Sequence, residues 1–389
     1  MTLNLDKSAW KRVAFGDVIE NVTDRVDDPS KAGVDRYVGL EHLDPGVMTV
    51  QRWDTPDKVE AQKLRFRPGD VIFGRRRAYQ KKVAQAEFEG ICSAHALVLR
   101  ARPDYIDPDF LPVFLSSDYF LDRAIEISVG SLSPTVNWRD LKVQEFDLPP
   151  LDEQKRMADL LWALDRHRQA VAFASHAARA LLLRVRADMF EADIDTVRAD
   201  EFFEITIGRQ RSPKHETGEH LVPYLRSANV TLGGIDTSDV KSMNFEPREQ
   251  EKFALATGDV LVSEASASAR SVGMPAVWHE NLTGTVCFQN TLLRYRARSG
   301  VSLPEYVEHY CHWAFETGKF LAAASGTNIR HIGVGGATSM RVRRASVSEQ
   351  EMFSAKVGAA AQALESLEAE LKSAKALLAS LTNGLFGGG

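Results

Sequence analysis

Two stretches of the chain carry apolar residues at alternating spacings of four and three positions. The clearer one runs through Phe353, Val357, Ala360, Leu364, Leu367, Leu371, Ala374, Leu378, Leu381 and Leu385. This spacing puts all of these side chains on one face of an α-helix and is the core pattern of a coiled coil. The sequence therefore predicts a long helix over residues 349–389, with one apolar face that requires a partner.

The second stretch lies earlier in the chain, at a constant offset of 196 positions, and predicts a helix over residues 153–193. Its corresponding positions run from Met157 to Met189 and are apolar except for Arg168 and Ser175. Because each helix offers the other a matching apolar face, we expect them to pair within the chain as an antiparallel coiled coil. The alternatives are pairing between two copies of the chain, or packing of each helix on its own domain.

The repeat continues outside the helices and indicates a duplicated domain. Leu97–Arg102 matches Leu293–Arg298 at the same separation of 196, and Pro68–Ile72 matches Thr257–Leu261 at 189. Short apolar runs in both regions are separated by Gly, Pro and Asp, which is typical of strands and turns. The fold class is therefore predicted to be α+β.

The two copies are predicted at residues 1–152 and 194–348, so that each domain is followed by one of the long helices. Near its end, each copy has a single expected helix and then a loop of small residues. These loops contain Gly130-Ser131 in the first copy and Gly326-Thr327 in the second. The sequence thus predicts two tandem domains together with a pair of long antiparallel helices.

Composition narrows the classes of protein that remain. Lys and Arg number 48 against 53 Asp and Glu, which excludes a globally basic nucleic-acid binder but leaves room for local basic patches. Three cysteines rule out a disulfide scaffold and favour a reducing compartment. The sequence has no run of apolar residues as long as the roughly 18 that a membrane helix needs, and no secretory signal pattern at its start. We therefore expect a cytoplasmic protein without a membrane helix.

Sequence motifs for catalysis are missing. The sequence contains no phosphate-binding G-x-x-x-x-G-K-[ST] loop, no H-E-x-x-H, and no Asn/Asp-Pro-Pro-Tyr/Phe loop of an adenine methyltransferase. Gly333–Gly336 does not follow a strand pattern and is interpreted as a turn. Cys92, Cys287 and Cys311 lack the spacing of metal ligands. We expect no catalytic residue, no metal site and no cofactor bound by this chain.

Positive charge is concentrated in one segment of the first domain. Residues 63–82 contain eight Lys and Arg against the single acid Asp70. Arginine suits bidentate contacts with guanine edges and with phosphates, so this segment is a candidate DNA-binding surface. Its candidate residues are Arg75, Arg76, Arg77, Tyr79, Lys81 and Lys82. The alternative interpretation is a charged face that contacts only solvent.

The matching loop of the second domain has different chemistry, as two readers of different base sequences would require. It offers Ser266, Ser268 and Arg270. Basic and polar residues elsewhere in this domain extend the candidate surface. They are Arg209, Arg211, Arg226, Asn229 and Arg330.

The order of these landmarks, present twice, resembles the specificity subunit of a type I restriction-modification system. Phe146–Gln154, which reads FDLPPLDEQ, is close to that family's boundary sequence before a spacer helix. Tyr37–Glu41 and Phe66–Ile72 are also similar to family motifs. Arg343–Gln350, before the second helix, departs from the pattern because it lacks the prolines. A different entry into the second helix is therefore expected.

The resemblance implies a subunit without catalysis. Each target-recognition domain would read one half of a bipartite site in double-stranded DNA, and the coiled coil would fix the unread spacer between the halves. Two methyltransferase subunits would carry S-adenosylmethionine and methylate an adenine in each half. Restriction subunits, using ATP and Mg²⁺, would add cleavage in the full complex.

The outer faces of the two helices are expected to bind these partner subunits. The candidate residues are Arg166, Arg168, Arg179, Glu365 and Glu368. Two other functions remain open from the sequence. One is a recognition-like DNA-binding scaffold of another anti-phage system, and the other is a stand-alone DNA nuclease or methyltransferase.

Overall fold

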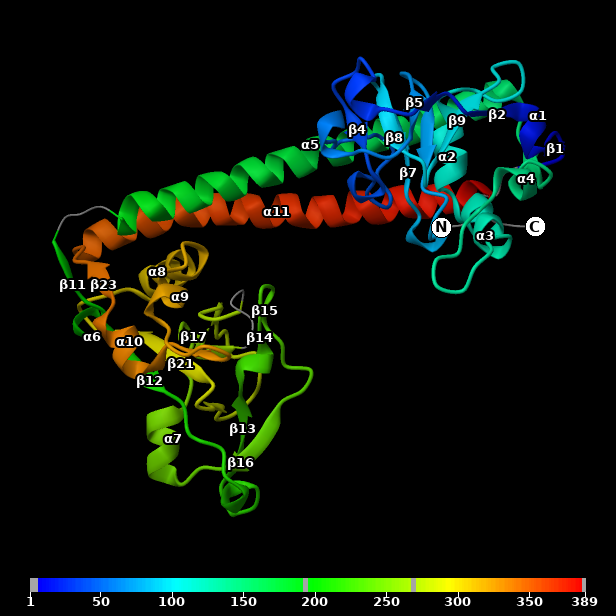
Figure 1. Ribbon diagram of the computed structural model, residues 1–389. Coiled ribbons are helices and arrows are strands. Elements are labelled where there is room, and N and C mark those ends of the chain that lie inside the picture. Colours follow the sequence, from blue (N-terminus) through cyan, green and yellow to red (C-terminus); the bar gives the residue numbers. More distant parts are fainter. Residues whose placement is uncertain (1–5, 192–194, 267–270, 387–389) are drawn as a thin grey trace. The chain divides into compact units, whose positions relative to one another are not determined.

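The computed structural model describes residues 6–191, 195–266 and 271–386, without the side chain of Ser266. The chain forms two compact units (Figure 1). Unit 1 comprises residues 1–174 and 367–389, and unit 2 comprises residues 175–366. The divisions fall inside the two long helices, so each helix contributes one part to each unit.

The long helices are α5 (Leu151–Phe190) and α11 (Val347–Phe386). In unit 1, Met157 and Leu161 from the first half of α5 share a core with Leu378 and Leu385 from the second half of α11. In unit 2, the second half of α5 and the first half of α11 share a core in the same way. These contacts confirm the predicted antiparallel pairing within the chain.

The remaining part of unit 1 contains two four-stranded sheets and a short strand pair. The antiparallel sheet has the order β2 (Ile19–Val22), β9 (Leu97–Ala101), β6 (Val71–Phe73), β7 (Val83–Gln85). The mixed sheet has the order β3 (Arg25–Val26), β5 (Lys63–Phe66), β8 (Gly90–Ser93), β4 (Tyr37–Val38). The pair is β1 (Lys11–Ala14) with β10 (Glu145–Leu148). The helices are α1 (Phe15–Val18), α2 (Phe110–Ser116), α3 (Asp118–Glu126) and α4 (Trp138–Leu141), with 3₁₀ turns at Pro29–Lys31, Leu40–His42, Pro56–Lys58 and Ala78–Gln80.

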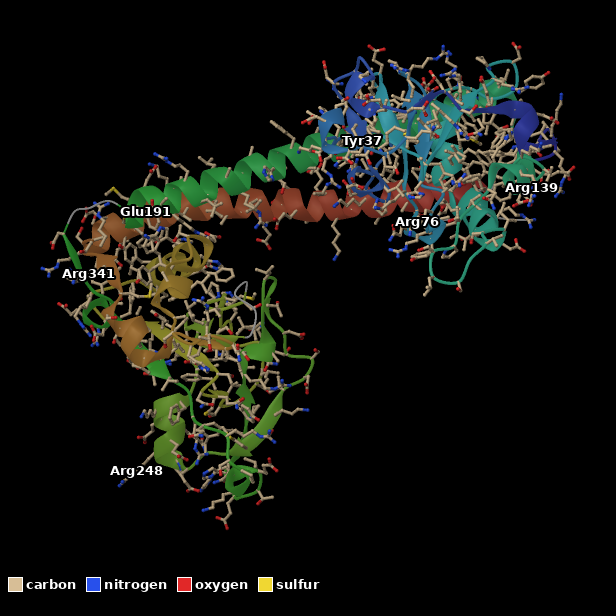
Figure 2. All side chains as sticks on the ribbon, in the orientation of Figure 1. Tyr37, Arg76, Arg139, Glu191, Arg248 and Arg341 are labelled. Carbon is tan, nitrogen blue, oxygen red and sulfur yellow. The ribbon has the colours of Figure 1, made fainter. Side chains whose placement is uncertain are left out.

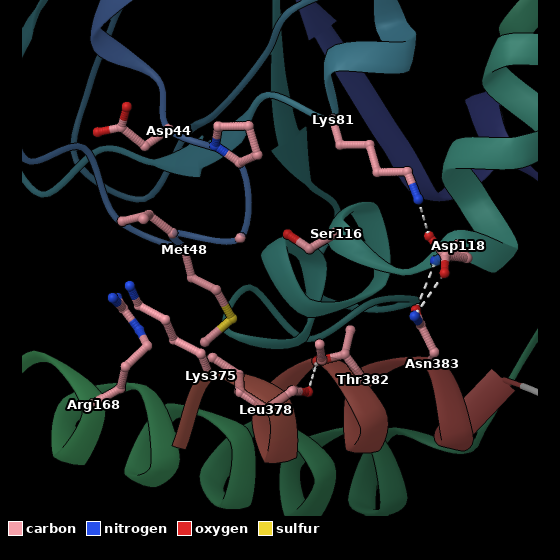
Figure 3. A pocket seen from close by; sticks show the side chains of 14 residues that line it. Asp44, Met48, Lys81, Ser116, Asp118, Arg168, Lys375, Leu378, Thr382 and Asn383 are labelled. Carbon is pink, nitrogen blue, oxygen red and sulfur yellow. Dashed lines mark hydrogen bonds and ion pairs between the residues drawn. The ribbon is translucent and has the colours of Figure 1, made fainter. Parts of the chain in front are cut away.

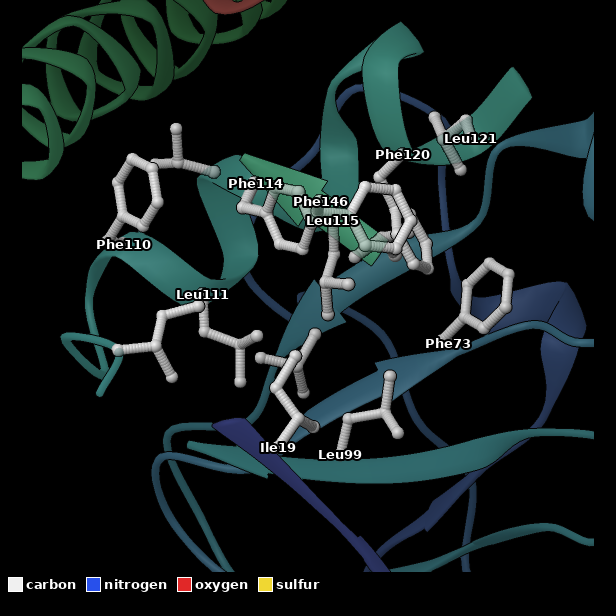
Figure 4. Close-up of a cluster of buried hydrophobic side chains, with 14 of the residues drawn as sticks. Ile19, Phe73, Leu99, Phe110, Leu111, Phe114, Leu115, Phe120, Leu121 and Phe146 are labelled. Atoms are coloured by element: carbon white, nitrogen blue, oxygen red, sulfur yellow. The ribbon is translucent and has the colours of Figure 1, made fainter. Parts of the chain in front are cut away.

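A group of phenylalanine rings packs together with aliphatic side chains in the core of unit 1 (Figure 4). Phe114 lies within ring-contact distance of Phe120 and Phe146, at 5.5 and 5.2 Å between centroids. Phe386, at the end of α11, stacks on Tyr119 at 5.5 Å. The far end of the chain therefore completes the core that the N-terminal domain begins.

Unit 2 repeats this plan. Its antiparallel sheet has the order β12 (Phe203–Ile207), β21 (Leu292–Ala297), β17 (Val260–Ser263), β19 (Pro275–Val277). A three-stranded sheet has the order β16 (Lys241–Asn244), β13 (Leu221–Leu225), β20 (Cys287–Phe288). The remaining strands form pairs: β11 (Thr196–Arg198) with β23 (Arg341–Arg343), β14 (Val230–Thr231) with β15 (Gly234–Ile235), and β18 (Ala265–Ser266) with β22 (Arg330–His331). Its helices are α6 (Ala199–Phe202), α7 (Pro247–Phe253), α8 (Pro304–Glu316), α9 (Lys319–Ala323) and α10 (Gly333–Ser339), with 3₁₀ turns at Pro213–His215 and Ser227–Asn229.

The interpretation of Gly333–Gly336 as a turn is wrong, since these residues begin α10. Ala337 in this helix is fully buried. A Cβ atom at Gly336 would lie 3.0 Å from the carbonyl oxygen of Ala323. The glycine therefore allows α10 to pack closely on the end of α9, and this packing outweighs the low helix propensity of glycine.

A buried glutamine fastens the start of each long helix. The Gln154 side chain accepts a hydrogen bond from the Asp107 amide at 2.8 Å and donates to the Pro149 carbonyl at 2.8 Å. Gln350 makes the same bonds at the start of α11, with the Leu303 amide at 2.8 Å and the Ala345 carbonyl at 2.9 Å. The segment before α11 lacks the two prolines that precede α5, yet Gln350 makes both hydrogen bonds that Gln154 makes. The different entry that we expected for the second helix is therefore not seen in these hydrogen bonds.

Candidate nucleic-acid interface

The loop that joins β6 to β7, residues 74–82, is called the arginine loop. The side chains of Arg76, which is labelled in Figure 2, and of Arg77 are exposed to solvent. Tyr79 is 52% exposed. Arg77 and Lys81 have φ angles of +56° and +52°, in the left-handed region that costs a non-glycine residue about 1–3 kcal/mol. The loop is thus held in a strained shape that presents Tyr79 outward.

A second loop, the 129–136 hairpin, holds the arginine loop in place. The amide of Arg77 donates to the Pro134 carbonyl at 2.7 Å, and the amide of Val136 donates to the Arg75 carbonyl at 3.0 Å. Val129 and Thr135 close the hairpin with a reciprocal pair of backbone bonds at 3.0 and 3.1 Å. Two segments that lie far apart in the sequence therefore form one surface.

The predicted basic segment is not one continuous surface. Lys63 is buried and donates to the Ala61 carbonyl, and Arg65 donates to the Ala32 carbonyl at 2.7 Å. Lys81 forms an ion pair with Asp118, and Lys82 donates to the carbonyl of Leu40. The Nε atom of Arg75 is buried without a partner in the described part of the chain. The most exposed candidates of the segment are Arg76, Arg77 and Tyr79, whereas Lys81 and Lys82 are partly exposed and stay predicted DNA contacts.

Arg76 and Arg77 line a cavity of about 310 Å³ together with His95 and polar groups of Glu41, Gln80 and Ser93. Partial burial lowers the pKa of His95, and the nearby positive charges of Arg76 and Arg75 lower it further. The imidazole is therefore favoured in its neutral form, as one donor and one acceptor beside two cationic heads. This arrangement suits an anionic ligand that also carries hydrogen-bonding edges.

Unit 2 builds the matching surface from the matching segments. Its β18 pairs with β22, and Ser325 and His331 exchange backbone hydrogen bonds at 2.9 and 2.8 Å, as Val129 and Thr135 do. We call residues 325–332 the 325–332 hairpin. Arg330 is exposed on this hairpin. Ser266 lies in β18, while Ser268 and Arg270 fall outside the described residues.

The other unit 2 candidates divide into two groups. Arg209 is largely buried and forms an ion pair with Glu249 at 3.0 Å. Asn229 is 2% exposed, and its amide donates to the carbonyls of Asp236 and Asp239 at 2.9 and 3.1 Å. These two side chains hold unit 2 together, which corrects their prediction as DNA contacts.

Arg211 and Arg226 keep an accessible position. They line a cavity of about 470 Å³ with Tyr224, Lys241 and Gln289. Each has an acidic neighbour, since Arg211 contacts Glu216 at 2.7 Å and Arg226 contacts Asp239. A bound polyanion would compete with these carboxylates for the guanidinium groups.

On the helices, Arg166, Glu365 and Glu368 are exposed and Arg179 is at the surface, as the partner-binding prediction requires. Arg168 is instead buried in unit 1, where it contacts Asp165 at 2.7 Å. It lines a cavity of about 510 Å³ with Met48 and Lys375 (Figure 3). The prediction that Arg168 lies on an outer helix face is therefore wrong.

The described residues show no group of three or more His, Cys, Asp or Glu placed to hold a metal ion. Burial raises the pKa of the Cys92 thiol far above its usual range and that of the Cys287 thiol to about 12, so both stay protonated. Within the same residues, no helix is both long and apolar enough to cross a membrane.

Comparisons with known proteins agree with this architecture. A family model described as a type I restriction modification DNA specificity domain matches residues 8–171. The chain is 26% identical over 147 residues to the type I restriction enzyme EcoDI specificity subunit of Escherichia coli. That alignment covers 37% of this chain and 32% of the relative, so the match spans about a third of the relative's length.

Two solved structures match nearly the whole chain. A chain from a study of complex assembly and conformational transition of the type I R-M system has 23% identity and a TM-score of 0.57, covering 97% of this chain and 98% of that one. The type I restriction-modification S subunit from M. genitalium has 15% identity and a TM-score of 0.64, covering 100% of both. These likenesses confirm the predicted fold class of two α+β regions with paired long helices.

Proposed function

Because residues 8–171 match the family model of a type I restriction modification DNA specificity domain, we propose that the chain is the DNA-recognition subunit of a type I restriction-modification complex. The observation that carries this proposal is the joined surface of the arginine loop and the 129–136 hairpin. This surface presents the guanidinium groups of Arg76 and Arg77, the Tyr79 side chain and further hydrogen-bonding groups on a backbone held by hydrogen bonds between the two loops. Base edges and phosphates are the ligands that such a surface fits.

We further propose that residues 1–152 and 194–348 are two recognition domains, each reading one half of a bipartite site. The exposed chemistry differs between them, since unit 1 offers Arg76 and Arg77 where unit 2 has the strand β18. Two different half-sites would require this difference. The paired helices would set the unread spacer between the halves.

The partner subunits in this proposal supply the chemistry. Methyltransferase subunits would bind S-adenosylmethionine, and restriction subunits would use ATP and Mg²⁺ for cleavage, in the cytoplasm. The surface residues Arg166, Arg179, Glu365 and Glu368 are the proposed contacts with these subunits. The chain itself would bind no cofactor.

The test replaces Arg76 and Arg77 with Ala and measures DNA binding by the complex with its methyltransferase partner at several salt concentrations. Each lost phosphate contact is expected to reduce the slope of log K against log salt by about 1. Arg12→Ala is the matched control, because Arg12 is an exposed arginine on β1, outside both loops. Equal slopes for the double variant and the wild type would contradict the proposed interface.

Sequencing of host-genome methylation, with and without the gene, tests the proposal at the level of the whole complex. Loss of methylation at one bipartite motif is the expected result. Unchanged methylation would instead favour a scaffold role in another system.

A further inference from the structure

We propose that the residue in the middle of each hairpin, Leu132 in unit 1 and Asn328 in unit 2, determines which base its recognition domain accepts. Leu132 would contact a thymine methyl group, and Asn328 would bind an adenine edge. This inference rests on the proposed DNA-recognition function and deepens it. It concerns residues outside the basic segment that first indicated DNA binding.

The first step of the argument is the shared construction of the two hairpins. The reciprocal backbone pair of Val129 and Thr135 recurs at Ser325 and His331 in the second unit. Each hairpin contains a glycine with positive φ, +116° at Gly130 and +102° at Gly326. A Cβ atom at Gly326 would lie 2.3 Å from the carbonyl oxygen of Ile329, so this loop shape requires glycine. Leu132 and Asn328 stand at the same place in this common frame.

The second step is what surrounds each hairpin. In unit 1 the hairpin is bonded to the arginine loop, and Arg76 reaches Ser133 through a side-chain hydrogen bond of 3.4 Å. In unit 2 the hairpin includes the exposed Arg330. A ligand bound by these arginines would therefore lie against the residues of the hairpin.

The third step is the exposure and chemistry of the two side chains. Leu132 is 90% exposed, although the transfer of an apolar side chain of this size out of water is favourable. Asn328 is also exposed, and its amide makes no hydrogen bond among the described residues. Both side chains are therefore available to a ligand.

The different chemistry of the two residues fits two different bases. In the major groove, thymine alone presents a methyl group, which apolar side chains contact. Adenine presents an acceptor at N7 and a donor at N6, which the amide of asparagine matches with two hydrogen bonds. Two recognition domains that bind different half-sites can therefore share one hairpin backbone and differ in the residue at its centre.

The experiment uses the full complex with the methyltransferase partner and starts from the motif found by methylation sequencing. Each thymine in the unit 1 half-site is replaced in turn by deoxyuridine, which lacks only the methyl group. At one position we expect about a fivefold loss of affinity for the wild type and no further loss for Leu132→Ala. In the unit 2 half-site, each adenine is replaced in turn by 7-deazaadenine, which lacks the N7 acceptor. At one position we expect about a tenfold loss of affinity for the wild type and no loss for Asn328→Ala.

Leu232→Ala is the matched control, because Leu232 is 84% exposed in the turn between β14 and β15, outside both hairpins. This variant should keep the wild-type response to deoxyuridine. Additive effects of Leu132→Ala and every deoxyuridine substitution would overturn the assignment of Leu132, even if the complex still binds its motif. A wild-type complex that binds no sequence selectively would instead overturn the proposed function, and this inference with it.

Discussion

At the scale of single residues, a buried aspartate after the glycine turn is repeated closely in the two units. Asp70 is 1% exposed, accepts a hydrogen bond from the Arg67 amide at 2.9 Å, and binds Arg100 through two bonds of 2.7 and 2.9 Å. Asp259 makes the same contacts with the Ala256 amide and Arg296. The carboxylate closes the turn and ties it to the neighbouring strand.

Replacement of Asp70 by Asn should lower the free energy of unfolding by about 3 kcal/mol, because Arg100 loses a paired charge at a buried site. Denaturant unfolding of the purified chain measures this change. Glu145→Gln is the control, since Glu145 pairs with Arg12 at the surface and such pairs contribute less than about 1 kcal/mol. Equal losses for both variants would contradict the structural role of the buried pair.

Two histidines of α8, the buried His309 and the partly buried His312, predict an acid sensitivity. Burial, and then the charge of Arg186, lowers the pKa of His309 and His312 to about 3. The unfolded chain takes up these protons near the ordinary pKa of 6.5, whereas the folded chain does not. The free energy of unfolding should therefore fall by a few kcal/mol as the pH is lowered from about 6.5 towards 3.

The double variant His309→Gln and His312→Gln tests this sensitivity, because glutamine does not titrate. Unfolding midpoints measured between neutral and mildly acidic pH should decline less steeply for the variant than for the wild type. Parallel declines would show that the histidines do not cause the acid sensitivity.

At the scale of elements, the two long helices end in equivalent aromatic anchors. Phe386 of α11 contacts Phe110, Phe114 and Tyr119 in unit 1. Phe190 of α5 contacts Tyr306, Tyr310 and Trp313 in unit 2. Each ring fastens the end of one helix to the unit in which the other helix begins.

The variant Phe386→Ala should destabilise unit 1 by about 3–5 kcal/mol, because a large cavity replaces a buried ring. Hydrogen exchange measured separately over the two units should show faster opening in unit 1 alone. Leu377→Ala, on an exposed face of the same helix, should leave the exchange of both units unchanged. Equal effects in both units would contradict a local anchoring role.

The long helices and the duplication could be predicted from the sequence because both leave regular spacings. The apolar positions from Phe353 to Leu385 follow a heptad pattern, and the second copy follows at a constant offset. Arg168 and Ser175 interrupt this pattern, yet both are buried in the helix pair. A charged side chain can thus occupy a seam when a neighbour pairs with it, as Asp165 does with Arg168.

The candidate site was less predictable, because charge in the sequence does not indicate which way a side chain points. Lys63 and Arg65 belong to β5, where they bond to backbone carbonyls instead of facing a ligand. The 129–136 hairpin contributes no charge, so only the repeated glycines at 130 and 326 marked it. Its docking on the arginine loop depends on tertiary contacts that no local pattern encodes.

At the scale of the whole molecule, the proposed spacer role predicts a dependence on helix length. One added heptad lengthens a helix by about 10.5 Å, which corresponds to about three base pairs of DNA. Insertion of one heptad in α5 after Ala174, and of another in α11 after Ser366, should abolish methylation at the original motif. Any remaining methylation should occur at a motif whose spacer is about three base pairs longer.

Methylation sequencing of cells that carry only the double insertion provides the measurement. Insertion in α5 alone is the comparison, because it shifts one seam against the other and should abolish activity without creating a new motif. Methylation at the original spacing in either strain would contradict the spacer role.

The division of the chain into its two units also sets an order for synthesis. Unit 2 is one continuous segment, so it can close as soon as Ser366 has left the ribosome. Residues 6–174 of unit 1 precede unit 2 in the chain, yet the core of unit 1 lacks Leu378, Leu385 and Phe386 of α11 until these residues have also been synthesised. Of the two units, unit 1 therefore enters synthesis before unit 2 but can complete its core only after it.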